Sequence, residues 1–161
     1  MAHKLKIVGE QELVVIVYSA RVELDECAEI WRELEAAQEF APHFDDLRLL
    51  APDADCSDIT ADAAMFLAQK FVEPFRNRAL SRLRRTAFIC NDNMHVAMAR
   101  MFGAFVNCEA VPNVEVADFQ SLAVAFDWIE IGRTHRLDRE RVKKAVVQMG
   151  AGWSLSRTDA A

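Results

Sequence analysis

The hydrophobic and polar positions of this chain define two kinds of segment that follow one another. Short apolar runs rich in β-branched residues predict strands over 5–8, 13–18, 47–51, 86–90 and 114–117. Longer stretches with an apolar residue every three or four positions predict helices over 24–39, 60–73, 92–106 and 121–131. Strands that alternate with helices favour a parallel sheet covered by helices.

The first two predicted strands are expected to pair differently from the rest. Only Gly9–Glu12 separates them, which is too short for a parallel crossover and suits an antiparallel hairpin. The run 13–18 is apolar throughout, as expected of a strand buried on both faces. We therefore expect one α/β domain with a mixed, mostly parallel five-stranded sheet, an N-terminal hairpin and helices on both faces.

The apolar pattern thins after Gly132, which suits the end of a helix. Arginines and lysines then dominate a weaker helical pattern that ends near Gly150. We expect an α/β domain over residues 1–131, followed over residues 132–161 by a basic C-terminal helix and a frayed tail.

Bulk composition fits a soluble chain of one domain. The 161 residues are 52% hydrophobic and 27% charged, with no apolar run near the roughly 20 residues that span a bilayer. The N-terminus lacks the apolar core of a signal peptide, so the expected location is the cytoplasm. The four cysteines form no Cys-x-x-Cys pair and match no zinc spacing.

Charge is distributed unevenly along the chain, whose net charge is −6. Residues 1–75 carry 16 acidic and 6 basic side chains, whereas residues 76–161 carry 9 acidic and 13 basic ones. Two explanations remain open: acidic solvated helix faces, or a basic surface for an acidic partner. Overall acidity and the lack of aromatics among the basic residues argue against nucleic acid as a partner.

The element order resembles the STAS domain (sulfate transporter and anti-sigma factor antagonist), in its SpoIIAA-like branch. That branch has an apolar strand, a polar turn, a helix ending in aromatic and small residues, an extended run and a short helix containing Trp. The corresponding segments here are 86–90, 98–105, 114–119 and 123–129. The resemblance covers roughly residues 5–131.

This resemblance implies a non-enzymatic regulatory module that binds a protein partner, a nucleotide or a lipid-like ligand. In phosphorylated members of the family, a Ser or Thr lies after the third strand, where this chain has Ser57 and Thr60. The chain departs from the pattern, because glycine is missing there. Asp53, Asp55 and Asp58 would also repel an added phosphate.

A second function hypothesis is a carrier or sensor of a lipid-like or anionic small molecule. Adaptable side chains could hold an apolar tail, namely Met98, Met101, Phe102 and Phe105, with Met94 beside them. The arginines Arg82, Arg84 and Arg85 could hold an anionic head. Each group also has a simpler explanation. The methionines and phenylalanines could be ordinary core residues. The arginines could lie on the solvated face of a short helix predicted over 75–83.

Catalytic signatures are missing from the sequence, and we expect neither an enzyme nor a cofactor. No metal site is predicted from the histidine spacing, and His95 is expected to be an exposed residue in the first turn of its helix. A third hypothesis gives Asp53, Asp55 or Asp58 a role with Mg²⁺ or as a phosphoacceptor. Edge strands and helix faces also allow a homodimer.

Overall fold

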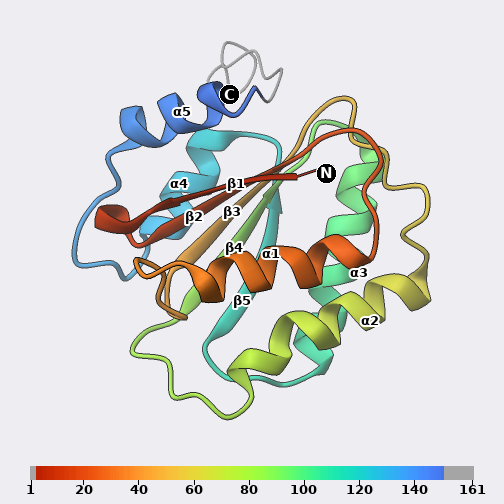
Figure 1. The fold of residues 1–161 in the computed structure, drawn as a ribbon, viewed down its shortest axis with the longest axis horizontal. Coiled ribbons are helices and arrows are strands. Elements are labelled where there is room, and N and C mark those ends of the chain that lie inside the picture. The colour runs from red at the N-terminus through yellow and green to blue at the C-terminus, as the bar shows by residue number, and fades with distance from the viewer. Residues whose placement is uncertain (1–2, 151–161) are drawn as a thin grey trace.

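The computed structural model describes residues 3–150 and contains a five-stranded sheet in the order β1-β2-β3-β4-β5 (Figure 1). The strands are β1 (His3–Val8), β2 (Leu13–Tyr18), β3 (Asp45–Leu50), β4 (Arg84–Ile89) and β5 (Val114–Phe119). Strand β1 runs antiparallel to β2, and the other neighbouring pairs are parallel. The predicted mixed sheet with an N-terminal hairpin is confirmed.

The hairpin turns through a 3₁₀ helix, η1 (Gly9–Gln11), and the left-handed residue Glu12, whose φ is 47°. Its register pairs Val8 with Leu13 at the turn and His3 with Tyr18 at the far end. The turn therefore lies at the edge where the parallel strands begin. We call it the amino edge.

Helices cover both faces of the sheet, as expected (Figure 1). Three crossover helices lie on one face: α1 (Asp25–Ala36), α2 (Ala61–Val72) and α3 (Asn93–Cys108). They share that face because each crossover moves to the next strand in the same direction and keeps the same hand. The other face carries α4 (Leu122–Glu130) and α5 (Arg139–Gln148).

The alternation of side chains along each strand builds two hydrophobic clusters. In β2, Val14, Ile16 and Tyr18 belong to the cluster under α1–α3, whereas Val15 and Val17 belong to the cluster under α4 and α5. Every residue of β2 is buried, as its unbroken apolar run predicts. The fold therefore has three layers, with the sheet in the middle.

Strands β3 and β4 begin two residues earlier than predicted, at Asp45 and Arg84. Both strands are buried along their whole length although their first residues are charged. The predicted helical piece over 75–83 is wrong, because a 3₁₀ turn, η2 (Glu73–Phe75), is followed by irregular chain. The arginines before β4 therefore do not share a helix face.

The apolar stripe of α3, interpreted from the sequence as Met94, Met98, Met101, Phe102 and Phe105, is buried only in part. Met94 is 65% exposed, and Met98, Met101 and Phe105 are only half-buried. The fully buried positions are His95, Ala99, Phe102, Gly103 and Val106. The small Ala99 and Gly103 let the helix approach the sheet, and a Cβ built on Gly103 would lie 3.5 Å from Val116.

Beyond α4, Gly132 adopts a φ of 76° and ends the helix, as its predicted cap requires. Helix α5 follows and packs on the sheet through Val142, Val146 and the adjoining Met149. The predicted frayed tail, 151–161, lies outside the described residues. Within residues 3–150, no helix is long and apolar enough to cross a membrane.

Candidate functional site

The carboxyl edge of the sheet holds the loop predicted to carry a phosphoacceptor. Thr60 is the N-cap of α2, and its Oγ1 accepts a hydrogen bond from the Ala63 amide at 3.2 Å. Ser57 is exposed, and its amide donates to Asp55 Oδ1 at 2.9 Å. Hydrogen bonds from Ser57 lower the pKa of Asp55. Both residues are exposed, and each hydroxyl already takes part in a hydrogen bond within the loop or the helix start.

The three acidic residues of this loop do not converge. Asp58 pairs with Arg21, whose Nε lies 2.6 Å from the carboxylate, and Asp55 forms a backbone bridge with the same arginine. Throughout the described part of the chain, no three His, Cys, Asp or Glu side chains are placed to hold a metal ion.

His95 lies at the same edge but is buried, at 3% exposure, so its predicted exposure is wrong. Its Nε2 donates to the Ala54 carbonyl at 2.8 Å, and its Nδ1 lies 3.3 Å from Asp92 Oδ2. The Asn91 amide group donates to the Leu50 carbonyl at 3.2 Å. These bonds fasten the loop after β3 to the start of α3 and close this end of the sheet.

Large apolar side chains are exposed on or next to the three helices that begin at this edge. Met65 and Phe66 of α2 are 42% and 50% exposed, and Met94 projects from the first turn of α3. Leu24, at the start of α1, is also exposed. We call these four residues, together with the loop 52–58, the carboxyl-edge surface. Surfaces that contact a partner are typically richer in such exposed apolar side chains.

A separate hollow of about 400 Å³ opens between α1 and α2. Its aromatic lining comes from Trp31, Phe71 and Phe102, and Phe71 and Phe102 pack edge to face at 5.4 Å. Phe102 also borders a much smaller hollow, of about 40 Å³, to which Met98 contributes. Of the predicted apolar ligand residues, these two line hollows. Met101 and Phe105 pack against the first core cluster.

Arg48 lies at the base of both hollows, with its guanidinium 5.2 Å from the Phe71 ring centre. It donates to the Tyr18 hydroxyl at 3.0 Å and to Asp46 Oδ2 at 3.1 Å. Asp46 also accepts from Arg84 Nη2 at 2.7 Å. Burial alone would raise the pKa of Asp46, but the guanidiniums of Arg84 and Arg48 hold it below its usual value.

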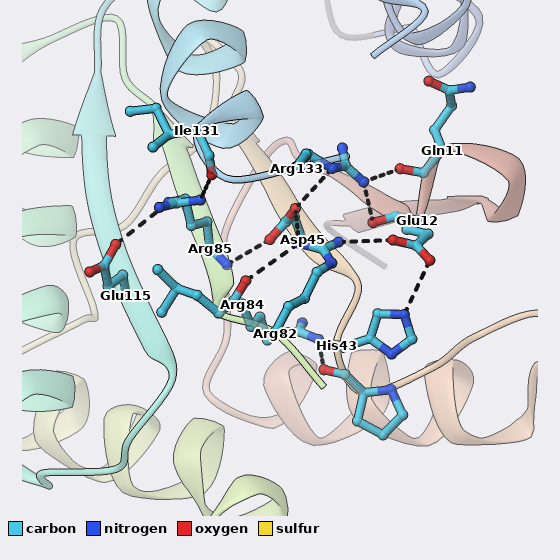
Figure 2. A network of polar contacts seen from close by, with 12 residues as sticks. Gln11, Glu12, His43, Asp45, Arg82, Arg84, Arg85, Glu115, Ile131 and Arg133 are labelled. Carbon is cyan, nitrogen blue, oxygen red and sulfur yellow. Dashed lines mark hydrogen bonds and ion pairs between the residues drawn. The ribbon is translucent and has the colours of Figure 1, made fainter. Parts of the chain in front are cut away.

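The neighbouring Asp45 faces the opposite side of the sheet and is surrounded by a second set of arginines (Figure 2). Its Oδ1 accepts the Arg85 amide at 2.7 Å, and its Oδ2 lies 2.9 Å from Arg82 Nη1. Arg133 Nε lies 3.6 Å from the same Oδ2. Burial raises the pKa of Asp45 despite these contacts.

The structure separates the three arginines predicted to act together. Arg84 is fully buried under α1, where it also donates to the Pro42 carbonyl. Arg85 points to the other face, over the Trp128 ring and against the Ile131 carbonyl (Figure 2). Arg82 borders a polar hollow at the amino edge.

The sequence interpretation missed four charged residues of these networks: Asp45, Asp46, Arg48 and Arg133. A usable signal did exist, because paired acids precede one predicted strand and paired arginines precede the next. Parallel neighbours align their amino ends, so such opposite charges can meet. The face that each side chain would take could not be predicted without the exact strand start.

The fold is that of a STAS-type α/β domain, a class that is generally non-enzymatic and often contacts proteins. The chain belongs to the SpoIIAA-like family, whose model matches residues 13–130. Neither the curated proteins nor the solved structures contain a match to it.

Proposed function

We propose that this protein is a cytoplasmic regulatory module that binds a protein partner through its carboxyl-edge surface and catalyses no reaction. The observation that carries the proposal is the group of exposed apolar side chains around an edge that is itself closed. Phe66 is 50% exposed and Met94 is 65% exposed, so both large apolar side chains lie mostly in water. A partner that covered them would remove that apolar area from water.

The internal use of charge supports a binding role over a catalytic one. Asp46, Arg48 and Arg84 are engaged with one another inside the fold. The two buried thiols, Cys56 and Cys90, have pKa values raised by burial to about 11 and about 12, so they are protonated at neutral pH. A protonated thiol is a poor nucleophile.

Site-specific photo-crosslinking in cells tests this proposal. A photo-reactive residue replaces Phe66 in one variant and Val147, an equally exposed apolar residue on α5, in the control. We expect one discrete adduct from position 66 and none from position 147. An adduct whose mass is that of two copies of the chain would identify the partner as the protein itself. Equal labelling at both positions, or none at position 66, would contradict docking at this surface.

A second candidate function is a carrier or sensor of a lipid-like anion, and the hollow between α1 and α2 favours it. Trp31 and Phe71 offer an apolar wall, and the guanidinium of Arg48 lies at its base. A fatty acid carries matching chemistry, with an apolar tail and a carboxylate. This function differs from protein docking because it needs the hollow and not the outer surface.

Trp31 fluorescence with added oleate tests the carrier hypothesis. We expect saturable quenching in the original protein and its loss in Ala28→Trp, because Ala28 lines the hollow from the exposed face of α1. Extraction of the purified protein should then recover a bound apolar acid. No saturation, or equal binding by Ala28→Trp, would exclude this hollow as the site.

A further inference from the structure

A polar hollow of about 710 Å³ lies at the amino edge, opposite the carboxyl-edge surface. Four separate segments of the chain form it: the hairpin turn, His43 just ahead of β3, the residues before β4 and the loop after α4. The lining residues are Gly9, Glu10, Gln11, Glu12, His43, Ser81, Arg82, Gly132, Arg133, Thr134, His135 and Arg136. Three arginines and two histidines thus face two glutamates.

Both glutamates already have basic partners. Glu10 pairs with Arg141, which lies outside the hollow. Glu12 contacts Arg82 at 3.3 Å and His43 at 3.3 Å (Figure 2). The pKa of Glu12 is lowered, because His43 and Arg82 outweigh the effect of burial. The remaining positive charge comes from Arg133 and Arg136.

Arg82 and Arg133 are held close together at the base of the hollow, because both approach the same oxygen of Asp45. Burial lowers the pKa of Arg133, and repulsion from Arg82 lowers it further. The Arg133 side chain is only 6% exposed, and its Nη2 is fixed by the Gln11 and Glu12 carbonyls. Its Nη1, like Nε of Arg82, has no hydrogen-bond partner among the described residues.

We propose that this hollow binds the phosphate group of a small polar ligand, held by Arg82, Arg133 and Arg136. Guanidinium groups recognise phosphate through charge-assisted hydrogen bonds, and buried donors without partners cost free energy that an anion would recover. A doubly charged group also relieves the repulsion between two arginines that share one carboxylate. The volume leaves room for more than the phosphate itself.

This site is independent of the docking proposed above, because the two lie at opposite edges of the sheet. Thermal unfolding at constant ionic strength tests it, with glycerol phosphate and pyrophosphate as probes and chloride as the reference anion. We expect saturable stabilisation by the phosphates and none by chloride. Phosphatidic acid in phosphatidylcholine vesicles serves as a separate arm, and binding to the vesicles without binding to the soluble probes would overturn the proposal.

Three single substitutions locate the anion. Arg82→Gln and Arg136→Gln should each weaken phosphate binding about tenfold or more, because each removes a charged donor. Arg136 is exposed, so its replacement leaves the buried network intact. The control is Arg100→Gln, which removes one arginine from an exposed pair with Asp118 on α3 and β5. Equal weakening by all three, or none by Arg136→Gln, would overturn the proposal.

Discussion

Two adjacent carboxylates at the start of β3 have opposite electrostatic surroundings. Asp46 accepts from Arg48, Arg84 and the Thr86 hydroxyl inside the first core cluster. Asp45 lies on the other face, where burial outweighs its arginine contacts and raises its pKa. A strand that turns successive side chains to opposite faces makes this difference possible between neighbours.

Replacement of Asp46 by Asn should destabilise the fold strongly. The substitution leaves the buried guanidiniums of Arg48 and Arg84 without their shared carboxylate, and breaking a buried pair costs about 3–5 kcal/mol. Asp118→Asn is the control, since its partner Arg100 is well exposed and such pairs contribute about 1 kcal/mol or less. Urea unfolding measures both free energies. Similar losses for the two variants would contradict a special role for Asp46.

The pH dependence of stability should distinguish the two carboxylates. Asp45 has a raised pKa in the folded state, so its contribution is present at acid pH and is lost as pH rises through that pKa. Asp46 has a lowered pKa, so its contribution is present above the usual value and is lost as pH falls.

Between about pH 3 and pH 7, the unfolding free energy of the original protein should therefore fall relative to that of Asp45→Asn as pH rises. Relative to Asp46→Asn, it should gain stability over the same range. Free energies of unfolding from urea titrations at several pH values test both slopes. Slopes of the same sign for the two variants would show that the assigned pKa directions are wrong.

Secondary structure elements differ in how far the sequence determines them. The apolar run of β2 predicts a strand buried on both faces because hydrophobic burial does not depend on a particular partner. The polar starts of β3 and β4 could not be predicted in this way, because their burial depends on opposite charges from distant segments. Asp45 pairs with Arg82 from the segment before β4, and Arg84 pairs with Asp46 of β3. The sequence therefore predicts that the charged residues before 47 and 86 lie in loops.

Helix α3 shows the same limit. The sequence predicts a helix over 92–106, and the helix spans Asn93–Cys108. Its N-cap is Asp92, which accepts from the His95 amide at 2.8 Å. Of the predicted apolar stripe, Phe102 is buried, but the other buried positions include the small Ala99 and Gly103. The spacing of apolar residues predicts that a helix forms. Which of its residues contact the sheet depends on how closely the helix approaches the sheet.

The start of α2 offers a test of the two candidate hydroxyls. Thr60→Ala should cost about 1 kcal/mol of unfolding free energy because it removes the N-cap bond to the Ala63 amide. Ser57→Ala should change it by less than about 0.5 kcal/mol, as expected of an exposed surface position. A phosphate detected by intact mass on the protein from cells should be missing from Ser57→Ala and present on Thr60→Ala. A phosphate that persists there would assign the acceptor elsewhere.

At the scale of the whole molecule, the fold extends past the segment that the family model matches. The family match ends at residue 130, yet Arg133 donates to two carbonyls of the hairpin turn and α5 covers the face of β2. Lys4 of β1 donates to the Met149 carbonyl at 2.8 Å, which joins the first strand to the end of α5. Residues beyond 131 thus complete the second hydrophobic cluster.

A chain ending at residue 131 should consequently fail to fold stably, because the apolar face of β2 would lie in water. Two neighbouring substitutions on α5 test the same packing without truncation. Val146→Asp buries an unpaired carboxylate and should cost roughly 3 kcal/mol or more, whereas Val147→Asp at an exposed position should cost less than about 1 kcal/mol. Urea unfolding and near-ultraviolet circular dichroism measure both effects. Cooperative unfolding of the truncated chain with unchanged stability would establish residues 1–131 as a self-sufficient domain and α5 as an accessory to it.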